Sequence, residues 1–226
     1  MPTAKHIISQ IHDLTADLIE LGLCDKQNYP ALRNFGSRKS EIGISNKTNF
    51  SFVMRNIPYQ NIYDELDRTE TYNFRMLDGA LVQIMYRFTD DEIEEHRLAF
   101  FPSPYLEQFQ NNPEIYSDDE VYAEVIMRNI VPLPLRFDFI SREGEYEELR
   151  HPKSHLTLGQ YKNCRIPVCA PLTPYHFVSF ILRNFYHTAY TKYSDSIRPH
   201  SHCFSETIFI SEKAILHIQI PVSSLE

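Results

Sequence analysis

A nine-residue stretch that begins at His151 reads His-Pro-Lys-Ser-His-Leu-Thr-Leu-Gly. In an extended chain alternate side chains lie on the same face, so His151, Lys153, His155 and Thr157 would form one stripe. Two imidazoles, an ammonium group and a hydroxyl on one face can bind a phosphate, or move a proton near neutral pH. We predict His151 and His155 as acid–base residues and Lys153 as a phosphate ligand, with Thr157 as a secondary candidate. A solvated strand face that happens to contain histidine is the plainer alternative.

The same residue types recur between Pro174 and about Tyr190, where proline at the first helical position favours a helix. His176, Arg183 and His187 are spaced seven and then four residues apart, so they share one stripe of that helix. If the two stripes face one cleft, Arg183 becomes a phosphate ligand, with His176 and His187 as secondary candidates. The alternative is a helix face exposed to water.

Two more residues complete the predicted site. Arg165 lies between the two stripes in the sequence, and we predict it to be a phosphate ligand. Asp138, on the strand expected before His151, is the carboxylate that can join them as a secondary candidate. A site of arginine and histidine with few acids suits metal-independent phosphodiester chemistry, because histidine moves protons while a cation stabilises developing negative charge. We therefore expect neither a cofactor nor a catalytic metal.

A structural zinc site is a separate hypothesis. Five residues have side chains that bind zinc: Cys164, Cys169, His200, His202 and Cys203. Their spacing matches no standard zinc module. Cys164 and Cys169 are also an odd number of residues apart on a predicted strand, so they point to opposite faces. The sequence leaves open whether these residues hold a metal.

Residues 155–158 (His-Leu-Thr-Leu) resemble the His-x-Thr/Ser-x strand of the two-histidine phosphoesterases, a family that needs two such strands. The second candidate strand is 217–220 (His-Ile-Gln-Ile), where glutamine replaces the required hydroxyl. The chain departs from that family at this residue.

The distribution of charge points to a ligand that carries phosphates. Taken over the whole chain, the net charge of −8 argues against nucleic-acid binding. However, residues 55–149 hold eight basic and twenty-one acidic groups, whereas residues 150–203 hold seven basic groups, one acidic group and six of the ten histidines. This asymmetry suggests a surface for a polyanion, or an acidic surface at 55–149 for a basic protein partner. Alternatively, the two segments pack against one another.

The N-terminal residues predict a helix over 4–22, because apolar side chains recur at helical spacing between a capping Thr3 and a terminating Gly22. Residues 24–50 are polar and rich in turn residues, and we interpret them as a long, mobile connection. A sheet-rich core over 51–226 is expected to follow.

Alternation of apolar and polar residues predicts strands in that core. The expected elements are a hairpin of 72–76 and 81–88, a strand over 96–101, short helices near 106–110 and 119–127, a strand over 133–140, paired strands over 154–159 and 164–169, and a closing hairpin of 207–210 and 215–222. Runs of strands with helices between them indicate the α+β class. We expect a mainly antiparallel sheet, on which the N-terminal helix and the helix at 174–190 pack.

Length and composition favour a single domain over 1–226. The length lies within the single-domain range, and 42% hydrophobic residues exclude a disordered chain. We find no secretory signal, no apolar run long enough to cross a membrane, and too few cysteines for a disulfide framework. We therefore expect a cytoplasmic protein without membrane contact.

Several short motifs occur together in the middle of the chain. They are Ile-Met-Tyr-Arg-Phe (84–88), Phe-Pro-Ser-Pro (101–104), Arg-Phe-Asp-Phe (136–139), His-Pro-Lys-Ser-His (151–155), Arg-Ile-Pro (165–167), Pro-Leu-Thr-Pro (171–174) and Phe-Ile-Leu-Arg-Asn-Phe-Tyr (180–186). As a set they resemble an uncharacterised prokaryotic family, a domain of unknown function numbered twenty-two ninety, over roughly residues 72–187. The resemblance implies a prokaryotic source and no particular activity. A place in a defence-type or mobile gene cluster would be in keeping with such a family.

These observations favour a nucleic-acid-acting domain, a metal-independent ribonuclease or phosphodiesterase that uses the basic, histidine-rich surface of 150–203. The rival hypothesis is a non-catalytic interaction subunit of a protein complex. In that case the acidic segment 55–149 binds a basic partner, and the histidines are structural. The first hypothesis requires the side chains of His151, His155, Arg165, Arg183 and His187 to converge.

Overall fold

The computed structural model describes residues 1–36, 38–44, 57–106, 111 and 131–223. Within these residues nine strands form one sheet, and every strand pair in it is antiparallel. Helices pack on both faces of the sheet. The predicted α+β class with a mainly antiparallel sheet is therefore confirmed.

The first helix, α1 (Ala4–Glu20), matches the prediction for residues 4–22. Thr3 stands at its N-cap, and the Thr3 backbone N–H donates to Nδ1 of His6 at 3.2 Å. Gly22 follows the last turn with a φ of 64°, the left-handed conformation that glycine adopts most easily. The apolar stripe predicted from the spacing is buried against the sheet, as Ile7, Ile11, Leu14 and Leu18 show.

The strands are β1 (Cys24–Gln27), β2 (Ala31–Phe35), β3 (Lys39–Gly43), β4 (Phe74–Met76), β5 (Leu81–Thr89), β6 (Glu92–Phe101), β7 (Leu135–Ile140), β8 (Ser154–Leu158) and β9 (Ile166–Pro167). They lie in the order β1-β4-β5-β6-β7-β8-β9, while β3 pairs with both β5 and β2. The predicted strands between Tyr72 and Cys169 are thus confirmed. They include the hairpin at Asp78-Gly79, where Gly79 has a φ of 83°.

The segment 24–50 was expected to be a mobile connection, and this prediction is wrong for its described part. Residues 24–43 contain β1, β2 and β3, which form one end of the sheet. Their polar composition misled the prediction because the side chains of β1 and β2 are mostly exposed. Backbone hydrogen bonds to β4 and β5, which composition does not reveal, hold β1 and β3 in place, and β2 pairs with β3. Residues 45–50 lie outside the described residues.

The closing hairpin predicted at 207–210 and 215–222 is also wrong. The chain forms a short helix there, α6 (Ile210–Lys213), because the Glu212 carboxylate turns back and accepts a hydrogen bond from the Phe209 N–H at 3.0 Å. The following residues join the sheet only through an isolated parallel bridge between Val168 and Ile218. The short helices expected at 106–110 and 119–127 lie outside the described residues, apart from Leu106.

The helix predicted from Pro174 to about Tyr190 is divided into α4 (Pro174–Phe185) and α5 (His187–Tyr193), followed by the 3-10 turn η2 (Ser194–Ser196). The break is at Tyr186, whose φ and ψ of −137° and 55° are not helical. Its buried hydroxyl donates to both carboxylate oxygens of Asp78, at 2.9 and 2.8 Å. Burial raises the pKa of Asp78 to about 6. The break in the helix therefore coincides with a buried carboxyl group.

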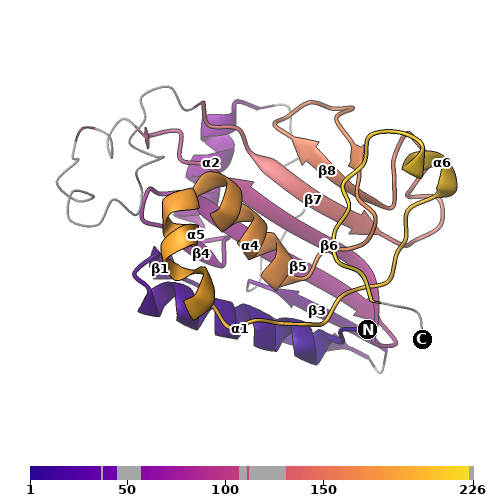
Figure 1. The fold of residues 1–226 in the computed structure, drawn as a ribbon, viewed down its shortest axis with the longest axis horizontal. Helices are drawn as coiled ribbons and strands as arrows, with labels where there is room; N and C mark the ends of the chain where they lie inside the picture. Colours follow the sequence, from indigo (N-terminus) through magenta and orange to yellow (C-terminus); the bar gives the residue numbers. More distant parts are fainter. Residues whose placement is uncertain (37, 45–56, 107–110, 112–130, 224–226) are drawn as a thin grey trace.

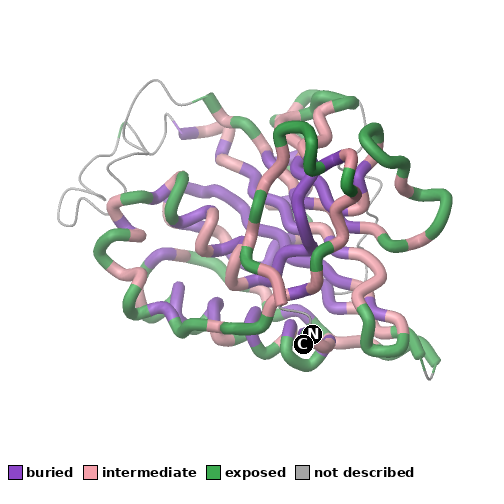
Figure 2. The backbone as a smooth tube through the Cα atoms, turned by 45° about the vertical axis from the view of Figure 1, so that its right-hand side comes forward, coloured by how far each residue is buried: buried purple, intermediate pink, exposed green. Residues whose placement is uncertain are grey.

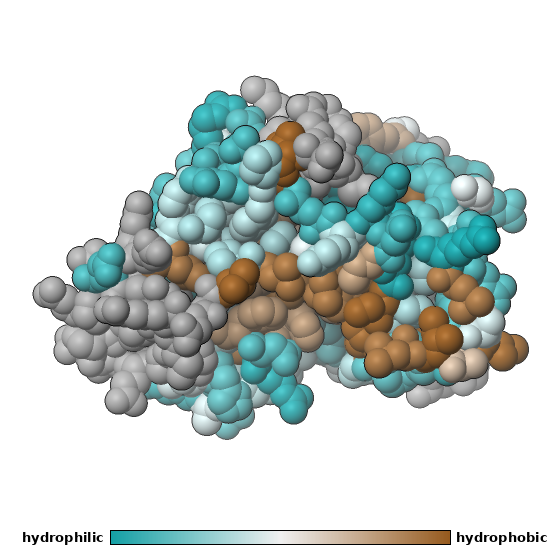
Figure 3. Space-filling view, turned by 90° about the horizontal axis from the view of Figure 1, so that it is seen from above, coloured by the Kyte–Doolittle hydropathy of each residue, from teal (hydrophilic) through white to brown (hydrophobic). Residues whose placement is uncertain are grey.

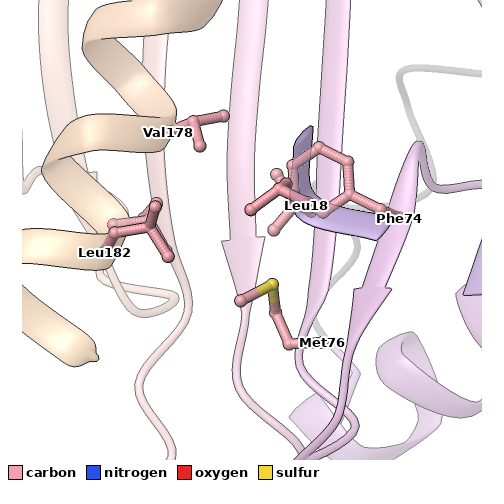
Figure 4. A pocket seen from close by; sticks show the side chains of 7 residues that line it. Leu18, Phe74, Met76, Val178 and Leu182 are labelled. Carbon is pink, nitrogen blue, oxygen red and sulfur yellow. The ribbon is translucent and has the colours of Figure 1, made fainter. Parts of the chain in front are cut away.

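The two faces of the sheet are covered differently. Figure 1 looks onto the face that α1, α4 and α5 cover, and Figure 2 shows the buried strands behind these helices. On the opposite face, α2 (Tyr59–Arg68), which the sequence did not predict, packs over Leu81, Ala99 and Phe101. A small pocket remains between α1, α4 and the sheet (Figure 4), and its seven lining side chains, such as Met76 and Leu182, are all apolar. It therefore offers no group for catalysis.

Candidate functional site

The register of three neighbouring strands brings most of the predicted site residues together. Asp138 on β7 lies opposite Arg97 on β6 and opposite His155 on β8, so these three form one row across the sheet. Arg136 lies opposite Thr157 in the next row, and continuing the β8–β9 register by one residue adds Arg165 to that row. With His151, we call this set the arginine–histidine cluster: Arg97, Arg136, Asp138, His151, His155, Thr157 and Arg165.

The cluster lies on the sheet face that α2 covers in part. Side chains alternate along a strand, so Phe137 and Leu156 point to the other face, where they belong to the main hydrophobic core. Arg136 lies opposite Ala99, which packs against α2, so the cluster is on the same sheet face as α2. The strands that carry it, β6, β7 and β8, run side by side in Figure 1.

Asp138 is the electrostatic centre of the cluster. Its carboxylate accepts hydrogen bonds from Nε of Arg97 at 3.1 Å and from Nε of Arg136. All three side chains are between 12 and 15% exposed, so water screens them little. Burial alone would raise the pKa of Asp138, but the charges of Arg136 and Arg97 hold it well below its usual range. Asp138 is therefore ionised at neutral pH.

His155 is the neighbour of Asp138 on β8. Its Nδ1 is 2.9 Å from the carbonyl oxygen of Pro152, which can only accept, so Nδ1 carries the proton. Nε2 is then the titrating atom, 3.8 Å from Oδ2 of Asp138. Burial lowers the pKa of His155 to about 4, although Asp138 opposes the shift. The alternative interpretation of this stripe, a solvated strand face, does not hold for His155, which is only 2% exposed.

His151 is the outer imidazole of the pair. Its ring meets the His155 ring edge-on, with 5.0 Å between centroids, and it is half-buried. Burial and then the charge of Arg165 lower its pKa below the ordinary value of 6.5, while Asp138 opposes them. The charge of Arg165 also contributes to the lowered pKa of His155, after burial. His151 is therefore a neutral base at pH 7 that solvent can reach.

Lys153 has different neighbours from those expected. Its Nζ lies 4.5 Å from the ring centroid of Tyr146 and 5.3 Å from that of Phe209, two cation–π contacts. These contacts attach the segment before β8 to the chain at the start of α6. The ammonium group is thus engaged between two rings rather than presented to a ligand.

The expected convergence of the helix stripe with the strand stripe is wrong. The α4 ring of Phe177 packs edge-on against Phe137, so α4 covers the face opposite to Asp138 and His155. Arg183 and His187 are exposed on that side. His176 also belongs to α4, where its Nδ1 lies 2.9 Å from Oγ1 of the N-cap residue Thr173. Sequence spacing placed these residues on a common helix stripe but could not reveal which sheet face the helix covers.

The five residues considered for zinc do not form a site. Across the described parts of the chain, no group of three potential metal ligands is found, and all four cysteines are free thiols. Cys169 is buried and bonds to the backbone of Ile220. His200 lies 3.7 Å from Asp13, and His202 stacks on His6. These side chains attach the C-terminal segment to the rest of the fold.

Two cluster residues were not identified from the sequence as site residues. Arg136 occupies a polar position between Leu135 and Phe137 on a predicted strand, a pattern that resembles an ordinary solvated face. Arg97 follows His96 on another predicted strand, and its contact with Asp138 arises from strand pairing. A signal existed for Arg136, which is two residues from Asp138 and therefore on the same face of one strand.

The family of the chain follows from comparison with family models. The model of an uncharacterized conserved protein family, DUF2290, matches residues 23–220. The chain belongs to the DUF2290 family. The match includes every strand of the sheet and the whole arginine–histidine cluster, and it confirms the resemblance inferred from the motifs. No curated protein and no solved structure matches the chain. Among the described residues of this DUF2290 protein, no helix is long and apolar enough to span a membrane.

Proposed function

We propose that this DUF2290 protein acts on nucleic acid, and that the arginine–histidine cluster binds and cleaves a phosphodiester without a metal ion. The proposal is narrower than the one made from the sequence, because the helix residues Arg183 and His187 lie on the other side of the sheet and take no part in it. The observation that carries the proposal is the row arrangement on β6, β7 and β8. It sets Arg136, Thr157 and Arg165 beside a row that contains one carboxylate, Asp138.

The charge of the cluster favours an anion. Asp138 is already engaged by Arg97 and Arg136, so these three side chains together carry one excess positive charge. Arg165 adds another, and within the described residues it forms no ion pair or hydrogen bond. A phosphate would complement both charges, with its oxygens bound by guanidinium groups and the Thr157 hydroxyl.

In the proposed reaction, His151 is the catalytic base. Its neutral imidazole accepts the proton of the attacking hydroxyl, either a ribose 2′-OH or water, as that oxygen bonds to phosphorus. The bond between phosphorus and the leaving oxygen breaks, and the His151 imidazolium returns the proton to that oxygen. Arg136 and Arg165 stabilise the negative charge on the pentavalent phosphorus centre. His155 and Asp138 are positioning residues, since the buried His155 ring supports that of His151.

The experiment is a cleavage assay on labelled single-stranded RNA and DNA in the presence of a chelator. We expect cleavage by the wild type, and a loss of about 100-fold or more in His151→Ala, the range for a lost proton-transfer group. Arg165→Ala should also lose activity. His187→Ala and Arg183→Ala are matched controls, because they remove an exposed imidazole and an exposed guanidinium from the opposite face of the sheet.

The pH profile provides a second readout. Burial and Arg165 lower the pKa of His151 below 6.5, the ordinary histidine value. The rate should therefore decrease on acidification with a midpoint below pH 6.5, where His151 becomes protonated. Equal activity of His151→Ala, Arg165→Ala and the two controls would refute the assignment of the site.

A second candidate function is that of a non-catalytic interaction subunit, in keeping with a prokaryotic gene cluster. The acidic groups of 55–149 give this candidate little support, because residues such as Glu94 and Glu95 already pair with Arg142 of the same chain. Better support comes from exposed apolar side chains around α6, where Ile210 is 88% and Leu216 is 79% exposed. Figure 3 shows a band of apolar side chains across the face seen from above. Absence of cleavage, together with a stoichiometric protein partner, would favour this candidate.

A further inference from the structure

The turn that joins β8 to β9 carries an exposed aromatic ring next to the cationic row. Tyr161 is 71% exposed, and its neighbour Lys162 is also exposed. Residues 150–194 contain no aspartate or glutamate, so no acid of this segment opposes an anion at the turn. An exposed ring flanked by basic groups is the combination with which proteins hold unpaired nucleic-acid bases.

The ring of Tyr161 is held in place by the backbone of the turn. Gly159 has a φ of 59°, and a Cβ added there would lie 3.4 Å from Cδ2 of Tyr161 and 2.9 Å from Cδ1 of Leu133. The Gly159 N–H donates to the carbonyl of Pro134 at 2.6 Å. The absence of a side chain at Gly159 thus lets the ring rest on the main chain. A ring that is already positioned loses less conformational entropy when a ligand stacks on it.

The Gln160 side chain attaches the same turn to the entry of α2. Its Nε2 donates to the carbonyl oxygen of Ile57 at 2.8 Å. The turn is therefore anchored on both sides, by Pro134 just before β7 through Gly159 and by Ile57, two residues before α2, through Gln160. The exposed ring of Tyr161 is therefore carried by a turn whose position is fixed by hydrogen bonds.

The distance between the turn and the cluster suits a short piece of an extended nucleic-acid strand. Tyr161 lies four residues from Thr157 and four from Arg165, two neighbours in the row that would hold the phosphate. At about 3.3 Å per residue this separation is at most about 13 Å, within the reach of a dinucleotide. A base next to the bound phosphate can therefore reach the ring.

We propose that the nucleic acid bound by the arginine–histidine cluster is single-stranded, and that Tyr161 stacks on a base adjacent to the phosphate held by Arg136 and Arg165. This inference rests on the proposed function and adds the class of substrate to it. A base that stacks on a protein ring must be free of its neighbours and of its pairing partner, so a duplex does not satisfy the site. Lys162 would contact the backbone of the same strand.

Binding assays on the full chain test the proposal. The probes are a single-stranded DNA oligonucleotide, an RNA of the same sequence, the duplex form, and an abasic strand of equal length. We expect Tyr161→Ala to weaken binding of the base-containing single strands by roughly 5- to 150-fold, the range for one stacked base. Tyr161→Phe should restore the affinity, and the abasic strand and the duplex should bind Tyr161→Ala and the wild type equally.

A fluorescent residue reports stacking directly. The chain contains no tryptophan, so Tyr161→Trp carries a unique fluorophore at the turn. The single strand should quench its emission, and the abasic strand should not. Tyr29→Trp is the matched control, because Tyr29 is 54% exposed and lies beside His12 of α1, away from the turn.

The outcomes separate this inference from the proposed function. If Arg165→Ala loses affinity for every strand while Tyr161→Ala binds like the wild type, the cluster stands and the stacking inference is overturned. A preference for the duplex also overturns it. If the wild type binds none of the probes, the proposed function fails and this inference fails with it.

Discussion

Replacement of Asp78 by asparagine tests how the buried carboxyl group at the β4–β5 turn affects stability. Asp78 is 4% exposed, and no cation of the described residues bonds to its carboxylate. The partners of the carboxylate are the Tyr186 hydroxyl and the Ala80 N–H, which donates at 3.1 Å. Asparagine keeps an acceptor oxygen for Ala80, and its amide can donate to the Tyr186 oxygen. The variant therefore removes the charge and changes little else.

The magnitude follows from the pKa. Burial raises the pKa of Asp78 from 3.8 to about 6. At about 1.36 kcal/mol per pKa unit, this corresponds to about 3 kcal/mol. Between pH 4 and pH 6 the unfolded carboxyl is ionised while the folded one is still protonated. The unfolded state then binds fewer protons, so the free energy of unfolding of the wild type falls as the pH rises through this window.

Urea denaturation of both proteins from pH 4 to pH 7.5 measures this effect. The free energy of unfolding of Asp78→Asn, minus that of the wild type, should increase by about 3 kcal/mol over this range. Buried histidines such as His96, whose pKa burial lowers to about 3, titrate in both proteins and cancel in the difference. The exposed Asp195→Asn serves as the control and should show no such trend. A difference that stays constant with pH would refute the reasoning.

Three further substitutions test the contacts around the site. Asp138→Ala leaves two buried guanidiniums without their carboxylate and should cost about 3–5 kcal/mol of unfolding free energy in urea titrations, whereas a change below about 1 kcal/mol would contradict the ion-pair network. Gly159→Ala should lower the urea midpoint by an amount equivalent to about 1–2 kcal/mol, since φ is positive there; an unchanged midpoint would show that the turn relaxes freely. Glu212→Ala removes the acceptor of the Leu149 N–H and the Phe209 N–H and should speed amide hydrogen exchange at both, with the amide of Ala80 as an unaffected reference.

Much of the fold follows from local patterns in the chain. The periodicity of α1 and the caps at Thr3 and Gly22 predict its bounds closely, because helix hydrogen bonds and caps join residues a few positions apart. The hairpin at Asp78-Gly79 is likewise a local feature. In contrast, β1 and β3 were missed because they pair with strands more than 40 residues away in the chain. The strand β2 was missed with them, since it joins the sheet only through β3.

The candidate site shows the same division. Residue types and alternation along one strand were enough to select His151, His155, Thr157 and Asp138. The burial of His155, the attachment of Lys153 to aromatic rings, and the separation of Arg183 from the cluster all depended on how elements pack in three dimensions. Sequence spacing reports the direction of a side chain relative to its own strand or helix. Which strands become neighbours, and in which register, depends on burial and backbone hydrogen bonding across the whole sheet. That register is what places Arg97 and His155 beside Asp138.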